Sequence, residues 1–345
     1  MFLEIKNRLE SELKSYIRTI NNAYALNKLS PLLFNKIKEF ISREGKRVRP
    51  ILFCIGYLGF AKKEVKGLYR SALSLELLHD FMLIHDDIID KSDTRRGKPS
   101  MHSLFNAYLG KKKVKFNGED LSIIVGDVIY AMALDAFLAV KEEPYRKELA
   151  LKKLISAALF TGSGEFIELL LGIKPIEKTS QEDIYKIYDY KTANYTFASP
   201  LSMGAILAGA KNNEINKLLD YGMNLGRAFQ IKDDIIGTFQ DASQTGKSSL
   251  TDISEAKKTI LVWYAYKNTG VKGRAKIRSI FSGKNSGRKE LTEMRNLISE
   301  SGALDYAKEE INRLLDKSEK IIRTSKINNQ YRETLKDFSR KILAI

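Results

Sequence analysis

The chain has 345 residues and carries 58 lysines and arginines against 42 aspartates and glutamates, a net charge of +16. A single cysteine, Cys54, excludes an intramolecular disulfide framework. The basic residues are spread along the whole chain without a nucleic-acid-binding motif, so we expect small anionic partners and no nucleic acid.

Apolar residues recur at helical spacing from the start of the chain, and a first helix is predicted from Phe2, Ile5, Leu9, Leu13, Ile17 and Ile20. Ser30 followed by Pro31 is typical of a helix start, with serine as the N-cap and proline in the first turn. Alternating strand patterns are nearly absent, and no linker-like composition interrupts the helical pattern. We therefore predict an all-α fold in which residues 1–345 form a single domain.

Later helices are predicted from the residues that open them. Gly126 begins a long apolar run, and Pro144 begins a further helical pattern. Thr179 and Glu182 have the spacing of a capping box ahead of a helix that runs toward Tyr190.

No stretch is predicted to span a membrane. Residues 192–210 lack charges, but they include Asn194, two serines and Pro200, a composition that favours a buried core helix. The opening residues are already of mixed charge and show no signal-peptide pattern. We therefore expect a cytoplasmic protein without stable membrane insertion.

The segment LLHDFMLIHDDIIDKSDTRR, residues 77–96, has the composition of a metal and phosphate site. On a helix, His79, Leu83, Asp86 and Asp90 share one face. Two like charges one turn apart destabilise an isolated helix by about 0.2–0.5 kcal/mol, a repulsion that a bound divalent cation would offset. Carboxylate oxygens suit Mg²⁺, which typically takes one or two protein carboxylates and completes its shell with water and substrate phosphate.

Basic residues follow these acids at once. Arg95 and Arg96 carry forked, permanently charged groups that can grip phosphate oxygens. Acids for a metal beside bases for phosphate predict a diphosphate site, and the alternative is a solvated face of mixed charge.

A second acid motif, GRAFQIKDDIIGTF, occupies residues 226–239. On helical geometry Gly226, Phe229, Gln230 and Asp233 share a face, with Asp234 about 100° away. Glycine stands at position 237, so this copy lacks a third carboxylate. Two apolar helices that carry these motifs could face each other and hold metal ions between them.

The chain resembles the trans-isoprenyl diphosphate synthases of the polyprenyl synthetase family, and most of all the archaeal-type geranylgeranyl diphosphate synthases. Six motifs carry the resemblance in order: EGKRVRP at 44–50, DDIID with RRG at 86–97, KTANYT at 191–196, FQIKDD at 229–234, TGK at 245–247 and EAKKT at 255–259. The resemblance implies a large helical bundle around a deep central cavity and a homodimer. It also implies Mg²⁺-dependent head-to-tail condensation of isopentenyl diphosphate with an allylic diphosphate.

The matching positions imply a role for each motif residue. The residues that match the isopentenyl diphosphate site are Lys46, Arg49, His79 and Arg96. The Mg²⁺ ligands would be Asp86, Asp90 and Asp233. The bases beside the allylic diphosphate would be Arg95, Lys191, Lys247 and Lys257, and the groups that stabilise the allylic cation would be Thr192 and Gln230.

Local spacing supports part of this assignment. Lys46 and Arg49 are one turn apart on a helix and suited to one anionic group, although two solvated bases would have the same spacing. Residues 240–252 are polar and predict a flap over the second acid motif. The chain departs from the family at Glu165 and Glu168, where Gln and Asp are common, so their roles stay open.

Product length depends in the family on the residues four and five before the first acid motif, here Met82 and Phe81. One aromatic at the fifth position and none at the fourth predicts a twenty-carbon product, with a farnesyl or a longer-chain synthase as the alternative. A terpene cyclase would not need the second diphosphate site that GKRVRP and RRG supply. A non-catalytic subunit of the same fold would be expected to lose more acids from one motif.

Overall fold

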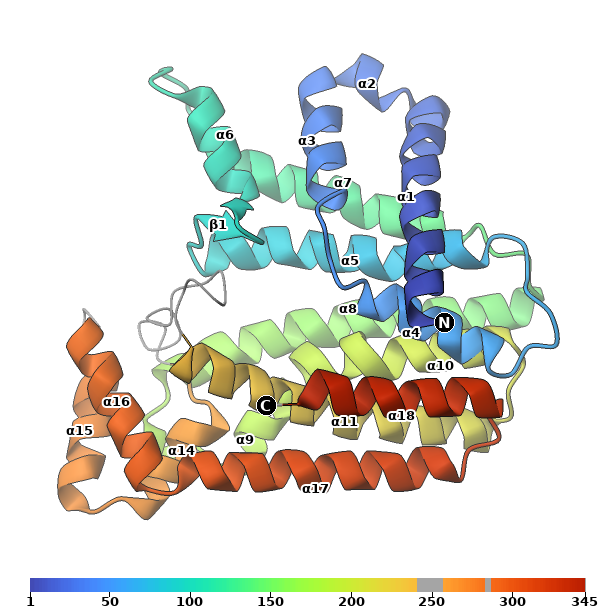
Figure 1. Ribbon diagram of the computed structural model, residues 1–345. Coiled ribbons are helices and arrows are strands. Elements are labelled where there is room, and N and C mark those ends of the chain that lie inside the picture. Colours follow the sequence, from blue (N-terminus) through green and yellow to red (C-terminus); the bar gives the residue numbers. More distant parts are fainter. Residues whose placement is uncertain (241–256, 283–286, 345) are drawn as a thin grey trace. The chain divides into compact units, whose positions relative to one another are not determined.

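The computed structural model describes residues 1–240, 257–282 and 287–344, and these residues are helical almost throughout (Figure 1). They pack into two compact units. The first comprises Met1–Leu154 and Pro200–Ala210, and the second comprises Ile155–Ser199 and Lys211–Ile345. The prediction of an all-α fold is confirmed, whereas the single domain over residues 1–345 stays a prediction.

The first unit is built from the N-terminal helices, and Figure 1 shows α5 and α7 side by side. Its elements are α1 (Phe2–Tyr24), α2 (Leu26–Leu29), α3 (Pro31–Ile41), α4 (Val48–Leu58), α5 (Leu68–Ile89), β1 (Thr94–Arg95), β2 (Lys98–Pro99), α6 (Met101–Leu109), α7 (Gly118–Phe137), the start of α8 (Pro144–Ile173) and most of α10 (Ser199–Leu207).

The N-terminal helices follow the sequence pattern. The buried face of α1 consists of Ile5, Leu9, Leu13, Tyr16, Ile17 and Ile20, which confirms the predicted amphipathic helix. At the start of α3 the Ser30 side chain accepts a hydrogen bond from the Leu33 amide, and Pro31 is the first helical residue. Cys54 in α4 is fully buried.

The predicted start of α7 is wrong. The helix begins at Gly118, where Asn117 and Asp120 form a capping box with two backbone–side-chain hydrogen bonds of 2.9 Å. Gly126 lies in mid-helix instead, where a Cβ would fall 2.4 Å from Nε2 of His85 on α5. The apolar run thus marks the packed part of the helix, and the helix begins earlier, at a polar cap.

The RRG sequence forms a small hairpin that the all-α prediction missed. Strands β1 and β2 are antiparallel, with Thr94 opposite Pro99 and Arg95 opposite Lys98. The two turn residues, Arg96 and Gly97, both have positive φ angles, 55° and 70°. That combination is typical of a type I′ turn, in which both central residues are left-handed. Arg96 therefore adopts a conformation that is uncommon for a non-glycine residue.

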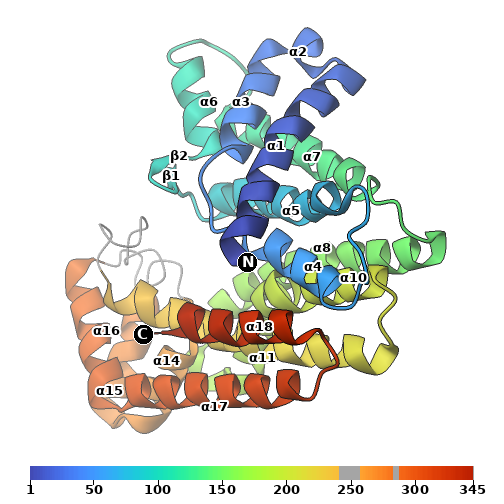
Figure 2. The same ribbon diagram turned by 45° about the vertical axis from the view of Figure 1, so that its right-hand side comes forward.

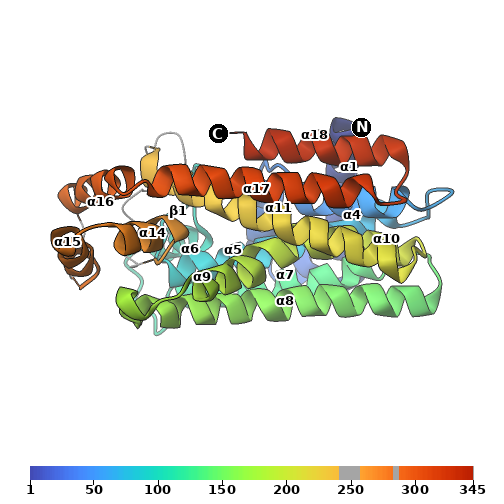
Figure 3. The ribbon, with the colours of Figure 1, turned by 90° about the horizontal axis from the view of Figure 1, so that it is seen from below.

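The second unit contains the long helices of the C-terminal half. Its elements are the rest of α8, η1 (Ile176–Lys178), α9 (Gln181–Ile187), η2 (Tyr188–Ala198), α11 (Asn212–Phe239), α14 (Ile260–Asn268), α15 (Val271–Ser282), α16 (Arg288–Glu300), α17 (Ala303–Arg323) and α18 (Asn329–Leu343). Helix α17 runs beside α11, and α18 packs against both of them (Figures 2 and 3).

The segment η2 is a π-helix, a form that is rare and often occurs at functional sites. Helix α11 lies directly against it, because a Cβ at Gly226 would fall 2.3 Å from Cα of Ala193. The glycine of the second acid motif therefore permits the close approach of these two elements. The helix before η2 is capped by Ser180 with Asp183, so the predicted cap of Thr179 with Glu182 is wrong by one residue.

Among the described residues, one helix has the length and composition of a membrane span. This is α8, and 33% of its apolar stretch is buried inside the protein. Core helices of soluble proteins pass the same test, so the expectation of no membrane insertion stays a prediction.

Candidate active site

The first acid motif lies at the C-terminal end of α5. Asp86 is in the last turn and Asp90 is the C-cap, with its amide donating to the Asp86 carbonyl at 2.8 Å. Both residues are half-buried. The negative end of the helix dipole and the neighbouring carboxylate both disfavour these charges, so the helix end attracts a cation.

Asp87, between these acids, has a different role. It is fully buried, and its Oδ1 accepts a hydrogen bond of 2.7 Å from Nε of Arg95 and a second contact from Nη2. Arg95 was predicted to neutralise a diphosphate, and the structure shows what orients its guanidinium. No sequence motif predicts this role of Asp87, because the contact depends on how the hairpin folds back onto the end of α5.

Arg96 extends from the hairpin turn toward two buried acids of α5. Its guanidinium nitrogens lie 3.8 Å from Oε1 of Glu76 and 3.8 Å from Oδ1 of Asp80. Glu76 also binds Nη1 of Arg47 at 2.7 Å. Burial, followed by the Glu76 charge, raises the pKa of Asp80 well above its ordinary value. These acids hold the arginines on the side of α5 that carries His79.

His79 is surrounded by the positive charges predicted to share a site with it. Burial first, and then the charges of Arg49 and Arg96, lower the pKa of His79 well below its ordinary value. The imidazole is therefore neutral at neutral pH and can donate one hydrogen bond to an anion. Three of the four residues predicted to bind isopentenyl diphosphate, Arg49, His79 and Arg96, therefore lie close enough for their charges to interact.

Lys46, the fourth of these residues, is exposed and precedes α4. The helix is capped by Arg47, whose φ angle of 51° ends the helical geometry before Lys46 is reached. The prediction that Lys46 and Arg49 lie one helical turn apart is therefore wrong, and Lys46 is carried by a loop.

The second acid motif presents its two aspartates differently. On α11, Asp233 is exposed and Asp234 is buried. The hydroxyl of Thr192 donates to Oε1 of Gln230 at 2.6 Å, and Nε2 of Gln230 donates to Oδ1 of Asp234 at 3.0 Å. The two groups predicted to stabilise an allylic cation are therefore in direct contact within the second unit.

Lys191 lies between two glutamates. Its Nζ forms short ion pairs with Glu165 and Glu168, which stand three residues apart on α8. Lys191 and the two glutamates together carry one positive and two negative charges. Their net charge is therefore negative, whereas a lysine alone would make this place positive and attract a diphosphate. The two glutamates that depart from the family pattern therefore have a partner, and that partner is a predicted site residue.

Of the remaining predicted bases, the structure describes Lys257, which precedes α14. Lys257 is half-buried, whereas Lys247 and most of the predicted flap lie outside the described residues. Lys258, which the sequence analysis did not single out, donates from Nζ to the Gly172 carbonyl at 2.7 Å. Burial lowers the pKa of Lys258 to about 8.

The two predicted chain-length residues differ in their surroundings. Met82 is buried in α5, and Phe81 is half-buried against α7. The Phe81 ring centroid lies 4.6 Å from that of His85 and 5.1 Å from that of Tyr130. Phe81 is thus part of an aromatic group to which Tyr130 of α7 contributes, a contact that no sequence motif predicts.

A model of the polyprenyl synthetase family matches residues 30–298 of the chain. A geranylfarnesyl diphosphate synthase of Aeropyrum pernix is 34% identical over 281 residues, which cover 78% of this chain and 80% of that protein. A geranylgeranyl diphosphate synthase of Sulfolobus acidocaldarius is 31% identical over 310 residues, covering 89% and 86%. The chain belongs to the polyprenyl synthetase family.

The fold agrees with this membership. A geranylgeranyl pyrophosphate synthase of Corynebacterium glutamicum, solved with isoprenyl diphosphate and magnesium, superposes with a TM-score of 0.89 at 25% identity, covering 99% of this chain and 98% of that one. This polyprenyl synthetase is therefore an enzyme that condenses prenyl units head to tail and forms a short-chain product. The cyclase and non-catalytic alternatives are not supported.

The acids of this polyprenyl synthetase fit a metal that is shared with substrate. Among residues 1–240, 257–282 and 287–344, no three His, Cys, Asp or Glu side chains are grouped to hold a metal ion. Mg²⁺ needs only one or two carboxylates when phosphate and water complete its shell. Asp86 and Asp90, at the negative end of α5, fit that requirement.

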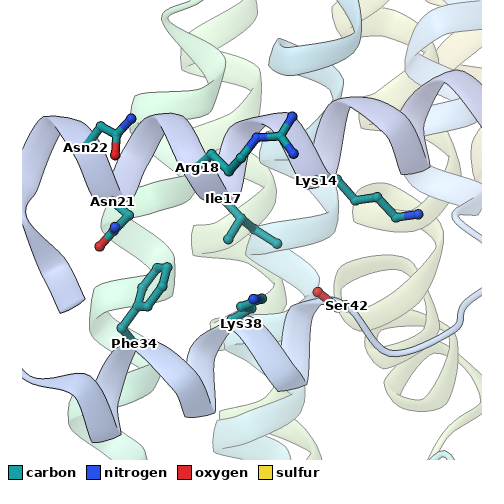
Figure 4. Close-up of a pocket in the computed structure, with 8 residues that line it drawn as sticks. All are labelled: Lys14, Ile17, Arg18, Asn21, Asn22, Phe34, Lys38 and Ser42. Atoms are coloured by element: carbon teal, nitrogen blue, oxygen red, sulfur yellow. The ribbon is translucent and has the colours of Figure 1, made fainter.

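A cavity of about 540 Å³ lies elsewhere in the first unit, between α1 and α3 (Figure 4). Lys14, Arg18 and Lys38 border it, together with Ile17 and Phe34. Of the predicted site residues that the structure describes, none lines this cavity.

Proposed function

We propose that this polyprenyl synthetase condenses isopentenyl diphosphate with allylic diphosphates, with Mg²⁺ as cofactor, and releases geranylgeranyl diphosphate. The observation that carries the proposal is the arrangement along α5. Asp86 and Asp90 stand one turn from each other at its C-terminal end, and His79, earlier on the same helix, is surrounded by arginines that other segments contribute. An acid pair for a metal and a separate basic group for a second anion are what a two-diphosphate reaction requires.

The residues of the acid motifs would prepare the allylic substrate for ionisation. Asp86, Asp90 and Asp233 would hold Mg²⁺, which when bound supplies a Lewis acid that stabilises the departing pyrophosphate. Lys257 and the Arg95 guanidinium, oriented by Asp87, would neutralise further phosphate charge. The oxygens of Thr192 and Gln230 would stabilise the allylic cation that the C–O bond cleavage leaves.

A second group of residues would hold the nucleophile. Arg49, His79, Arg96 and the loop residue Lys46 would bind the diphosphate of isopentenyl diphosphate, whose double bond attacks the allylic cation. Glu76 would support this by fixing Arg47 at 2.7 Å and by attracting Arg96. The released pyrophosphate is our candidate for the base that removes the final proton, because the motifs supply no other.

The function is tested by incubating the protein with isopentenyl diphosphate and Mg²⁺, and separately with five-, ten- and fifteen-carbon allylic primers. The products are then separated by chain length. We expect a twenty-carbon diphosphate from each primer and none after the metal is chelated. A fifteen-carbon end product would contradict the proposed length, and activity without divalent metal would contradict the cofactor.

Phe81→Ala should lengthen the products. Removing this ring from its contacts with His85 and Tyr130 would open space beside the first acid motif. Each further isoprene unit would then gain apolar burial at about 0.8 kcal/mol per buried CH₂. Phe34→Ala, which removes a half-buried ring from α3, is the control and should leave the product at twenty carbons. An unchanged product from active Phe81→Ala would make Phe81 a core residue only.

We further propose that the enzyme is a homodimer. In the second unit, α8 exposes large apolar side chains at helical spacing: Ile155, Leu159, Phe166, Leu170 and Ile173. Leu159 is 61% exposed and Phe166 is 64% exposed, values that favour a covering partner when such residues form a continuous stripe. The second copy is the occupant that we propose for this stripe.

Sedimentation equilibrium tests the dimer. We expect about twice the chain mass of 39.2 kDa for the wild type and the monomer mass for Leu159→Glu combined with Phe166→Glu. Val271→Glu, at an isolated apolar residue that is 82% exposed, should remain dimeric. A double variant that keeps the wild-type mass would show that the stripe on α8 is not the interface.

A further inference from the structure

A chain of hydrogen bonds connects the buried interior of the second unit to the two proposed cation-stabilising groups. Beyond the contact of Thr192 with Gln230, and of Gln230 with Asp234, the other carboxylate oxygen of Asp234 accepts a short hydrogen bond from the Tyr188 hydroxyl. The Tyr188 oxygen in turn accepts from the Ile260 amide at 3.0 Å. Tyr188 and Asp234 are buried, while Thr192 and Gln230 are half-buried.

The chemistry of these groups fixes the direction of every bond. An ionised carboxylate only accepts, so Asp234 requires the amide nitrogen of Gln230 on its side. The amide oxygen must then face Thr192, and the Thr192 hydroxyl must donate its single proton to that oxygen. The lone pairs of the Thr192 oxygen therefore remain available to a positive group. A flip of the Gln230 amide, which would make Thr192 the acceptor, is prevented by the hydrogen bond to Asp234.

Tyr188 is suited to hold the other side of the carboxylate. Burial first, and the Asp234 charge second, raise the pKa of Tyr188 well above its ordinary value, so the phenol keeps the proton that it donates. The Ile260 amide is the first of α14, one of the amides that have no partner inside their own helix. Tyr188 thus fixes Asp234 against the N-terminus of α14.

Hydrogen bonds that point in one direction strengthen one another. The donors run from Thr192 to Gln230 to Asp234, so the charge of the carboxylate draws the protons along the row. A group that donates a hydrogen bond becomes a better acceptor: Gln230 donates from Nε2, so its Oε1 becomes more negative. The Thr192 oxygen, which donates to that Oε1, becomes more negative in turn. That is the polarity that a developing carbocation requires.

We propose that Tyr188 and Asp234 are positioning residues for prenyl transfer, which orient Gln230 and polarise the Thr192 oxygen toward the allylic cation. This inference rests on the cation-stabilising roles proposed above for Thr192 and Gln230. The π-helix η2 carries both Tyr188, its first residue, and Thr192. It therefore places these two side chains against Asp234 and Gln230, which are one turn apart on α11.

The alternative is that Tyr188 is only a packed core residue, and a matched variant separates the two. Tyr185, three residues earlier, also donates its hydroxyl to a carboxylate, Oε1 of Glu310 at 3.0 Å, but it has no hydrogen bond to Gln230 or Asp234 among those in the described residues. Tyr185→Phe therefore removes a similar phenol–carboxylate hydrogen bond without touching the row.

The test compares kcat and KM for isopentenyl diphosphate, both from steady-state assays, together with thermal melting. For Tyr188→Phe we expect kcat to fall about tenfold, equal to about 1.4 kcal/mol of transition-state stabilisation, with KM changed less than about twofold. Asp234→Asn, which is isosteric and removes the charge, should have the same effect. Tyr185→Phe should keep the wild-type kcat.

A double-mutant cycle shows whether Tyr188 acts through Gln230. We expect Tyr188→Phe to add nothing to the loss caused by Gln230→Met, whereas independent effects would multiply. The inference is overturned if Tyr188→Phe and Asp234→Asn both keep kcat within about twofold of wild type, or if the cycle is multiplicative. Full activity of Gln230→Met would instead overturn the proposed role of Gln230, and with it this inference, while leaving prenyl transfer itself intact.

Discussion

Asp86→Ala and Asp233→Ala should each reduce prenyl transfer to less than about 1% of wild type while the protein stays folded, because each removes a carboxylate that we assign to Mg²⁺. Asp86 lies in the last turn of α5, where the helix dipole and Asp90 both oppose its charge. Its removal should therefore leave the free energy of unfolding unchanged or raise it by about 0.2–0.5 kcal/mol. Product formation and thermal melting, measured on the same samples, check both halves of this expectation.

Two exposed aspartates outside the motifs serve as controls. Asp93 follows α5 at the surface, and Asp220 is exposed on α11, the helix that carries Asp233. Their alanine variants should keep wild-type activity and melting temperature. If Asp86→Ala or Asp233→Ala retained more than a few per cent of activity with unchanged melting, the metal role of that motif would have to be abandoned.

Lys46→Ala should separate the two substrates. KM for isopentenyl diphosphate should rise about tenfold to a hundredfold, because a charge-assisted hydrogen bond to phosphate contributes about 1.5–3 kcal/mol. KM for the allylic diphosphate should stay nearly constant. Since Lys46 is exposed and precedes α4, the substitution should leave the melting temperature unchanged.

Initial rates measured with each substrate varied in turn decide this prediction. Lys63→Ala removes another exposed lysine of the first unit and should leave both KM values unchanged. Equal weakening of the two substrates by Lys46→Ala would show that the division of the basic residues between two diphosphates is wrong.

Features that depend on one helix were predictable from the sequence. The buried face of α1, the Ser30 cap of α3 and the shared face of Asp86 with Asp90 each follow from the 3.6-residue period, which relates residues within a few positions of one another. The motif order likewise pointed to the family that the comparisons then established. These are the properties that the amino-acid sequence determined by itself.

Partnerships between distant segments were decided only by the tertiary structure. No sequence pattern places Arg95 on Asp87, Lys191 between two glutamates of α8, or Tyr188 on Asp234, which is 46 residues away. The helical period of the sequence shows on which face of its own helix a side chain lies. It does not show which other helix packs against that face. That depends on how closely backbones approach, as Gly226 and Ala193 show, and on burial that forces each polar group to find a specific partner.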